Sequence, residues 1–364
     1  MVPDHADPAR GLIVREVTLR DFRSYSNLEV ALEPGLVLVS GPNGAGKTNL
    51  LEALHVGTQG FSPRTRSAAQ LVRLGAQAAR VRLRGTHDGV SLETELALDL
   101  RDARRARLNG ERLPSADHLR QRLRTLVFTP DRLAVVKAGP AARRAYLDRA
   151  AGRLFPSRAL LPLEYGSALG QRNAALRRVA AGLSSADALA PWTAAVAALG
   201  AELVELRRAA VAALAGPFAE TAALLGLARA VLAYEEAAPS AEEHEHRLAL
   251  DLERGMTGLG PHLHEVSLAA GGRELRRFGS QGEQRIAVLA LVLAEAAVLR
   301  ERHGASPLVL LDDVLSELDE RRRRALAELV AGGGQTVITA TSAAVLPLSP
   351  AQELAVRDGE VRPV

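Results

Sequence analysis

The stretch Gly41-Pro-Asn-Gly-Ala-Gly-Lys-Thr48 decides the fold, because it satisfies every fixed position of the phosphate-binding pattern G-x-x-x-x-G-K-[ST]. The apolar run Leu36-Val-Leu-Val39 before it has the length of a buried strand, and Asn49 to His55 after it carries leucines at helical spacing. The loop is therefore expected at a strand-to-helix turn. That is the setting which this motif requires, and it predicts an α/β fold around a nucleotide.

Each residue type in the loop has a chemical task. The glycines let the backbone curl around phosphate oxygens, and the N–H groups at the helix start supply partial positive charge. Lys47 is expected to reach the β- and γ-phosphates, and Thr48 to bind Mg²⁺. Lysine occurs only here and at Lys137 in a chain that otherwise uses arginine. The expected nucleotide-binding residues of this stretch are Gly41, Pro42, Asn43, Gly44, Ala45, Gly46, Lys47, Thr48 and Asn49.

Length and composition narrow the class of protein. A chain of 364 residues is long enough for two domains. The absence of cysteine excludes disulfides, thiolate zinc sites and cysteine nucleophiles, and it is compatible with a reducing compartment. The N-terminus has no apolar signal segment, and we find no run of 18 or more apolar residues. We therefore expect a soluble cytoplasmic protein with no membrane partner.

The charge is unevenly distributed along the chain. The whole chain carries a net charge of only +4, yet residues 101–178 hold 18 Lys and Arg against 6 Asp and Glu. A basic stretch is often only a solvated face, but a bias this strong also suits contacts with a phosphate backbone. Aromatic residues make up 3% of the chain, which argues against base stacking as the main mode of binding. Nucleic acid is the favoured partner.

The order of the segments predicts a head with an inserted helical domain. Strand-like segments at 13–19 and 28–32, joined by a polar tip at 21–27, form a hairpin. Others at 79–86, 90–98 and 104–108 form an antiparallel meander with a tight turn at Asn109-Gly110. From 141 to 227 the strand signals vanish, and Trp192 to Leu206 carries an apolar stripe typical of a bundle helix. Pro217 is expected to interrupt the helices, and 238–245 to loop out. The predicted domains are a head of residues 1–125 and 256–364 and a helical domain of residues 126–255.

A strand that ends in two carboxylates, Pro307-Leu-Val-Leu-Leu-Asp-Asp313, completes the phosphate loop. Alone it is a weak signal, because aspartate is common where strands turn into loops. Downstream of a phosphate-binding loop, Asp312 is expected to hold the Mg²⁺ shell, and Asp313 to orient the attacking water. Lys47, Asp312 and Asp313 are thus the expected catalytic residues, with Thr48 and Asp312 on the metal.

A second phosphate-binding segment is expected at Ser280-Gln-Gly-Glu283, ahead of the apolar helix 286–299. The S-x-x-E pattern is also that of a capping box, with Ser280 as N-cap. Gly282 is a poor helix former, and its lack of a side chain would let a phosphate approach the N-terminal amides. The two roles are compatible, so Ser280, Gln281, Gly282 and Glu283 are also expected at the nucleotide.

Taken together, these motifs resemble the ABC-type ATPase heads related to SMC proteins, and within that group the RecF family of bacterial recombination mediators. The resemblance runs from about residue 13 to residue 342. Besides the phosphate loop, the strand ending in Asp312 and the Ser316-Glu-Leu-Asp319 turn, it is carried by Leu19-Arg-Asp-Phe-Arg-Ser-Tyr25, Phe128-Thr-Pro-Asp131, Val136-Lys-Ala-Gly-Pro140, Arg143, Arg144, Tyr146-Leu-Asp148, Gly258 to His262 and Gln281-Gly-Glu-Gln284.

The resemblance implies a weak, DNA-stimulated ATPase that uses ATP and Mg²⁺. It also implies an ATP-dependent homodimer that binds DNA at gaps or junctions and, with RecO and RecR, helps place RecA on single-stranded DNA. Three features depart from the wider ABC pattern: Asp313 replaces a glutamate, the stretch after Thr339 lacks the switch histidine, and no Q-loop glutamine is found. Leu263-His-Glu265 departs from the RecF pattern of arginine followed by acids.

Three other classes of protein share parts of this pattern. A chromosome-organising or break-repair ATPase of the same superfamily needs far longer coiled coils or a Cys-x-x-Cys hook. The ATP-binding subunit of a membrane transporter is disfavoured by the helical insertion, the basic bias and the missing histidine. A metabolic P-loop kinase completes its site with its own lid, so the presence of the Ser280 segment disfavours this class.

Overall fold

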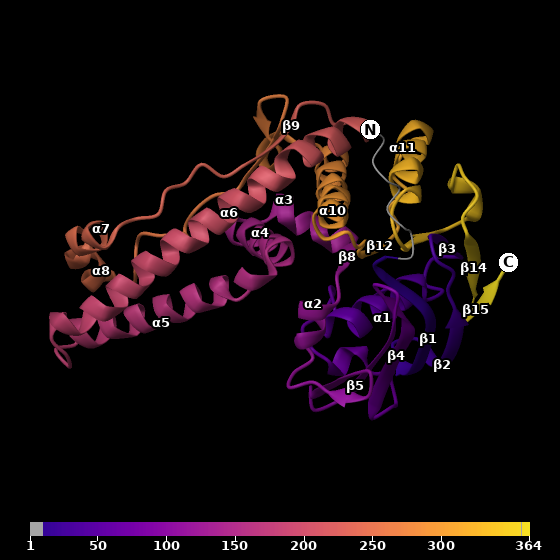
Figure 1. The fold of residues 1–364 in the computed structure, drawn as a ribbon, viewed down its shortest axis with the longest axis horizontal. Helices are drawn as coiled ribbons and strands as arrows, with labels where there is room; N and C mark the ends of the chain where they lie inside the picture. Colours follow the sequence, from indigo (N-terminus) through magenta and orange to yellow (C-terminus); the bar gives the residue numbers. More distant parts are fainter. Residues whose placement is uncertain (1–9, 358) are drawn as a thin grey trace. The chain divides into compact units, whose positions relative to one another are not determined.

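A computed structural model describes residues 10–357 and 359–364, which fold into two compact units (Figure 1). The first unit contains the described residues up to Leu133, together with Glu220–Leu227 and Gln281–Val364. The second contains Ala134–Ala219 and Ala228–Ser280.

A six-stranded sheet in the first unit carries the phosphate-binding loop. Its order is β15-β14-β3-β13-β12-β8, and all neighbouring strands are parallel except β15, which pairs antiparallel with β14. β3 lies inside this sheet and its five residues are all buried, as the apolar run predicts. The bounds are β3 Leu36–Ser40, β8 Thr125–Phe128, β12 Leu308–Leu311, β13 Thr336–Ala340, β14 Gln352–Arg357 and β15 Glu360–Pro363.

The second sheet of this unit is antiparallel, in the order β2-β1-β4-β5-β6-β7. The hairpin and the meander are confirmed, and Asn109 and Gly110 have φ of 50° and 83° in the tight turn between β6 and β7. The hairpin strands reach further than predicted, so its tip shrinks to Arg23 and Ser24. The bounds are β1 Leu12–Phe22, β2 Tyr25–Ala31, β4 Ala78–His87, β5 Val90–Asp99, β6 Arg104–Leu108 and β7 Glu111–Arg112.

The loop helix α1 (Lys47–Gln59) contacts strands of both sheets, including β4, β5, β8 and β13. It is buried on nearly every side, and the apolar side chains of both sheets form one core around it. The predicted α/β class, a P-loop sheet with an antiparallel lobe, is thus confirmed. The other helices of this unit are η1 Ala69–Leu71, α2 His118–Arg122, η2 Pro130–Leu133, α10 Gln281–His303, α11 Glu320–Ala331 and η5 Ala343–Val345.

The second unit is mostly helical and holds a small sheet in the order β11-β10-β9. Val196, Leu203 and Leu206 of the predicted apolar stripe are buried, whereas Trp192 at its start is partly exposed. The bounds are α3 Ala134–Lys137, α4 Pro140–Leu154, η3 Pro156–Arg158, α5 Leu161–Ala180, η4 Ala186–Leu189, α6 Ala190–Leu224, β9 Ala230–Ala233, α7 Ala241–His246, α8 Leu248–Arg254, β10 Ser267–Ala270, β11 Arg273–Glu274 and α9 Leu275–Phe278; the end of α6, from Glu220, belongs to the first unit.

The units and the predicted domain boundaries differ in three places. Residues 126–133 belong to the first unit, because β8 pairs with β12 in the parallel sheet. Residues 256–280 belong to the second, because β10 pairs with β9 there. Glu220–Leu227 returns to the first unit. The first two differences arise from strand pairing between segments that are far apart in the chain. The division into a head domain and a helical domain itself stays a prediction.

Two local predictions were wrong. Pro217 does not interrupt the helices, since α6 runs through it, with Leu214 and Phe218 on either side fully buried. The segment 238–245 is not all loop, because α7 begins within it. Its N-cap Ser240 accepts from the Glu243 N–H, and the Glu243 side chain accepts from the Ser240 N–H. The polar composition that suggested a loop is that of an exposed, capped helix.

Among the described residues, the helical stretch Ala186–Leu224 is long and apolar enough to cross a membrane by length and composition alone. The sequence expectation overlooked it, since charged residues interrupt its apolar run. Only 39% of its most apolar window is buried, and one such helix is weak evidence, because core helices share this composition. Arg207 on this helix is buried and paired with Asp148, as in a helix packed within a protein.

Candidate nucleotide site

The backbone of the loop between β3 and α1 requires glycine at two positions. Gly41 and Gly46 have φ of 152° and 117°, which side chains disfavour. A Cβ atom at Gly41 would lie 2.3 Å from the Val356 carbonyl oxygen, and one at Gly46 would lie 2.9 Å from the Tyr25 hydroxyl. That hydroxyl donates to the Gly46 carbonyl over 3.0 Å. β14 and the start of β2 therefore pack directly against the loop at these two glycines.

Lys47 is buried at the mouth of this loop. Its Nζ donates to the carbonyl oxygens of Gly41 and Pro42, over 2.7 Å and 2.8 Å. Burial lowers the pKa of Lys47, while the neighbouring Asp313 and Asp312 act in the opposite direction. The ammonium group is thus poorly solvated and gains from any further negative charge that enters the loop.

The strand β12 delivers Asp312 to the same place. Asp312 Oδ1 accepts from Thr48 Oγ1 over 3.0 Å and from Thr339 Oγ1 over 2.7 Å. Burial raises the pKa of Asp312, while these two hydrogen bonds and the Arg64 charge oppose the shift. A carboxylate and a threonine hydroxyl side by side are oxygen ligands of the kind that Mg²⁺ prefers, so the residues present fit that ion.

Asp313 lies on a strained turn. Its φ is 47°, in the left-handed region, and its N–H donates to Thr339 Oγ1 over 2.8 Å. Thr339, at the end of β13, thereby fixes both carboxylate residues. The Asp313 carbonyl accepts from Arg285 Nη2 over 2.5 Å. The sequence marked this stretch only for its missing histidine, and no local signal would have singled out the threonine.

These side chains surround an open cavity of about 240 Å³, whose lining is Asn43, Gly44, Gly46, Lys47, Thr48, Asn49, Arg64, Asp312, Asp313 and Thr339. Its size suits a chain of phosphates and a metal ion rather than a whole nucleotide. Larger hollows lie on the antiparallel sheet and between α6 and α11. Neither combines a lysine, a threonine hydroxyl and paired carboxylates, so the chemistry places the candidate site here.

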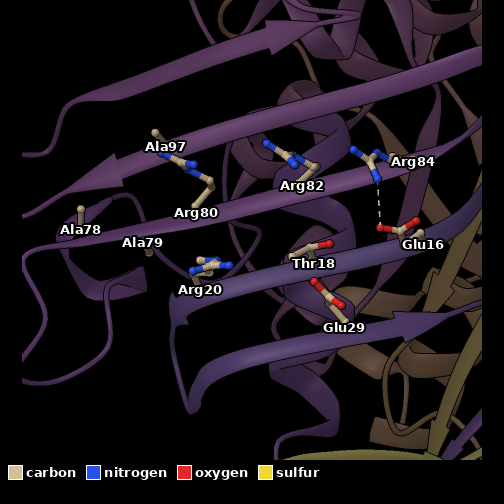
Figure 2. Close-up of a pocket in the computed structure, with 10 residues that line it drawn as sticks. All are labelled: Glu16, Thr18, Arg20, Glu29, Ala78, Ala79, Arg80, Arg82, Arg84 and Ala97. Atoms are coloured by element: carbon tan, nitrogen blue, oxygen red, sulfur yellow. Dashed lines mark hydrogen bonds and ion pairs between the residues drawn. The ribbon is translucent and has the colours of Figure 1, made fainter.

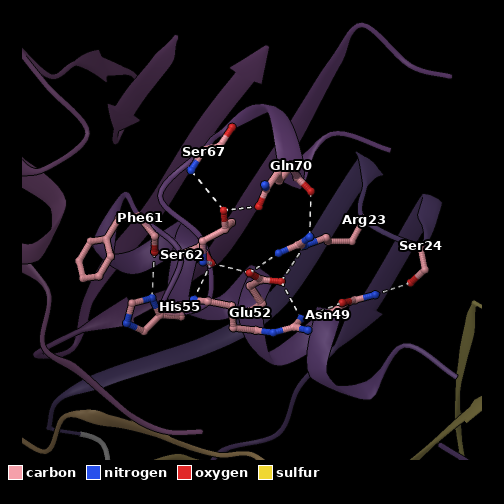
Figure 3. A network of polar contacts seen from close by, with 11 residues as sticks. Arg23, Ser24, Asn49, Glu52, His55, Phe61, Ser62, Ser67 and Gln70 are labelled. Atoms are coloured by element: carbon pink, nitrogen blue, oxygen red, sulfur yellow. Dashed lines mark hydrogen bonds and ion pairs between the residues drawn. The ribbon is translucent and has the colours of Figure 1, made fainter. Parts of the chain in front are cut away.

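Arg64 is a lining residue that the sequence did not reveal. Its Nη1 donates to Asn49 Oδ1 over 3.3 Å and to Glu52 Oε2 over 3.2 Å. Glu52 is 1% exposed on α1 and also accepts two hydrogen bonds from Arg23, each of 2.9 Å, and one from Ser62 (Figure 3). The one available signal in the sequence was Glu52 itself, a charged residue among the leucines of that helix, which must find a cationic partner if it is buried. The network fixes the connection after α1 against both the nucleotide cavity and the hairpin tip.

The Ser280 segment lies at the start of α10. That helix begins at Gln281, so Ser280 is in the N-cap position. Gln281, Gly282 and Glu283 are not among the residues that line the cavity. One turn further on, Arg285 is buried, pairs with Glu317 Oε1 over 2.7 Å and lies 5.6 Å from the centre of the Phe128 ring. Through Arg285 the helix is tied to the turn that follows β12.

The basic stretch 101–178 is divided between the two units, and several of its arginines are buried or paired. Arg143 donates to Glu265 over 2.7 Å, and Arg144 to the His264 carbonyl over 2.7 Å. These two contacts also give a structural role to Leu263-His-Glu265, the segment that departs from the RecF pattern. Sequence bias alone therefore overstates the charge available to a ligand.

Comparison with known proteins agrees with this geometry. Residues 13–354 match the family described as RecF/RecN/SMC N terminal domain. A protein of Moorella thermoacetica named DNA replication and repair protein RecF is 38% identical, over 92% of this chain and 92% of its own. The protein of the same name from Heliobacterium modesticaldum is 35% identical, over 90% of this chain and 92% of its own. That from Anaeromyxobacter dehalogenans is 39% identical, over 95% of this chain and 98% of its own.

Solved structures show the same fold. A structure described as the recombination mediator protein RecF with ATP, in the RecFOR pathway, superimposes with a TM-score of 0.85 at 26% identity, covering 96% of this chain and 97% of its own. An Smc head bound to the C-terminal winged-helix domain of ScpA gives a TM-score of 0.61 at 18% identity, covering 97% of both chains. The fold and the site thus define an ATPase head of the ABC and SMC type. Within that class, the chain belongs to the RecF family.

Proposed function

We propose that the cavity between α1 and β12 binds the phosphates of ATP with Mg²⁺. The observation that carries this proposal is the meeting of Lys47, Thr48, Asp312 and Asp313 around one open cavity. Lys47 exchanges its bonds to the loop carbonyls for bonds to the β- and γ-phosphates, and the amides of the loop bind the remaining phosphate oxygens. RecF structures with ATP and with ATPrS support the choice of nucleotide.

Thr48 and Asp312 hold the Mg²⁺ ion, which when bound neutralises charge on the phosphates. Asp313 orients the attacking water, and its position on a turn fixed by Thr339 and Arg285 keeps the carboxylate aimed at the site. The side chain of aspartate is one methylene shorter than that of the glutamate common in ABC ATPases. This favours a weak ATPase in which binding matters more than turnover.

The cellular role that best fits the family is recombinational DNA repair in the cytoplasm. ATP binding joins two copies of the chain on DNA at a gap or at a junction of single and double strands, and slow hydrolysis releases them. With RecO and RecR, this complex helps place RecA on single-stranded DNA. Support comes from relatives named DNA replication and repair proteins and from RecF structures described within the RecFOR pathway.

A lysine comparison tests the nucleotide assignment. Lys47→Met should abolish ATP binding, measured with a fluorescent ATP analogue, and should leave the melting temperature without nucleotide unchanged. Lys137→Met, the only other lysine substitution possible in this chain, should bind ATP normally. Unchanged ATP affinity in the Lys47 variant would show that the loop is not the site.

A mixing experiment tests whether Ser280 serves the partner's nucleotide. In a two-fold dimer each site would combine the loop of one chain with the Ser280 segment of the other. Lys47→Ala and Ser280→Arg are each expected to be inactive alone. When the two variants are mixed in equal amounts, about half of the dimers contain one chain of each, and each such dimer has one intact site out of two. The ATPase activity should therefore recover to roughly a quarter of that of the unmutated protein. No recovery in a mixture shown to contain mixed dimers would contradict the shared site.

A further inference from the structure

The outer face of the antiparallel sheet carries a row of arginines that crosses its strands. The cross-strand partners run Asn27, Arg20, Arg80, Ala97 and Arg105, from β2 through β1, β4 and β5 to β6. The other face of these strands is buried in the core, so the side chains in the row point outward. We name Arg20, Arg80 and Arg105 the arginine row.

The arginine row differs from the arginines beside it. Arg82 pairs with Glu95 over 2.8 Å, and Arg84 pairs with Glu93 over 2.7 Å and with Glu16 over 3.4 Å. By contrast, no ion pair joins Arg20 or Arg105 to another residue in the described part of the chain. Arg80 has one long contact, of 3.6 Å, with Glu95. The charge at this end of the sheet is therefore largely uncompensated.

This arrangement does not favour the isolated fold. Arg20 and Arg80 are direct cross-strand partners, and like charges in that position destabilise a sheet. Ala78 and Ala97 beside them are small, and an open hollow of about 480 Å³ remains over the strands (Figure 2). A surface that repels itself and leaves space between its guanidinium groups has the character of an anion-binding surface.

We propose that the arginine row binds the phosphate backbone of duplex DNA. This assignment rests on the proposed DNA-binding function and identifies the surface of the protein that contacts the DNA. Three strand spacings separate Arg20 from Arg105, about 14 Å in all. Duplex DNA carries one charge per about 1.7 Å of its axis, both strands counted, so a duplex of this length carries about eight phosphate charges, of which those on one side can reach the row. Each guanidinium group can donate two parallel hydrogen bonds to one phosphate.

The lining of the hollow favours DNA over an acidic protein partner. It consists of Glu16, Thr18, Arg20, Glu29, Ala78, Ala79, Arg80, Arg82, Arg84 and Ala97. Protein interfaces have an apolar core enriched in aromatic residues, whereas the only apolar residues in this lining are three alanines. Because the same lining has no aromatic ring for base stacking, the contact reads the backbone and not the sequence.

A pair of double variants tests the proposal in the full-length protein with ATP and Mg²⁺. Binding of a fluorescein-labelled 30-base-pair duplex is measured by anisotropy across a range of salt concentrations. Arg20→Gln with Arg80→Gln should lower the magnitude of the log–log salt slope by about 1.8, from about 0.9 for each lost phosphate contact. Arg82→Gln with Arg84→Gln removes the same charge from the same face but from paired positions, and should change the slope little. Arg20→Lys with Arg80→Lys should keep the slope.

The outcomes separate the surface from the function. If the unmutated protein binds the duplex and both glutamine variants bind as well as it does, or lose slope equally, the arginine row is not the surface, while the proposed DNA binding stands. If the unmutated protein binds no duplex but binds polyglutamate through the arginine row, both proposals fail in favour of an acidic protein partner. ATP-analogue affinity and unfolding of each variant are measured alongside, and both are expected to stay at the unmutated level.

Discussion

Two sets of arginines, one in each unit, behave in opposite ways. In the second unit Arg172 and Asp251 form an ion pair of 2.8 Å with both side chains 0% exposed, and Arg172 also donates to Thr257 Oγ1 over 2.7 Å. In the first unit the arginine row is exposed, and two of its three members have no ion-pair partner in the described residues. The same guanidinium group is thus part of a buried core at Arg172 and faces solvent in the arginine row.

The difference shows what separates a structural arginine from one available to a ligand. A buried cation must be paired, because burial without a partner costs several kcal/mol (about 3–5 when one partner is removed). An exposed cation pays no such penalty and can remain unpaired until an anion arrives. Burial and pairing, and not local charge density, therefore indicate which arginines are available to an anionic ligand.

The largest expected effect comes from breaking the buried pair. Arg172→Met should lower the free energy of unfolding of the second unit by up to about 3–5 kcal/mol, because the buried Asp251 carboxylate loses its nearest cation and keeps only the longer contact with Arg247, at 3.4 Å. Urea unfolding followed by fluorescence of Trp192, the only tryptophan and a residue of this unit, measures it. Adding Asp251→Leu should recover part of the loss. A loss below about 1 kcal/mol would mean that the pair is not structurally important.

A smaller effect is expected from acid. Burial lowers the pKa of His244, His262 and His264, all in the second unit, below their ordinary value of 6.5. The unfolded chain then binds protons more readily than the folded one, so the contribution of these groups is complete above pH 6.5 and is lost as the pH falls below it. The Trp192 unfolding midpoint should drop between pH 7 and 5.5. A constant or rising midpoint would contradict neutral, buried histidines.

The smallest effect is expected at the arginine row. Arg20→Thr removes one of two like charges that face each other and should raise the stability of the antiparallel sheet by no more than about 0.5 kcal/mol. Hydrogen exchange of the β1 and β4 amides reports it locally. Arg84→Thr is the matched control, and it should lower protection, because Arg84 is paired with Glu93. Lower protection in the Arg20 variant would show that the arginine row stabilises the sheet after all.

The sequence by itself determined the parts of the protein whose residues are neighbours in the chain. The phosphate loop, the buried strand before it, the turn at Asn109 and the two carboxylates at 312 and 313 are all local patterns. Glycine torsions, apolar runs and alternation act over a few residues, so the sequence shows them directly. These patterns were enough for the fold class, and the resemblance they carry was enough for the family.

Only the tertiary structure decided which distant residues meet. Arg64 enters the site through a buried Glu52, and Thr339 through the pairing of β12 with β13. Pro217 stays inside a helix because the core holds the residues around it. The arginine row exists because β1 pairs with β4, and its members are 60 and 25 positions apart in the sequence. Strand register and burial are properties of the whole chain, so no window of sequence contains them.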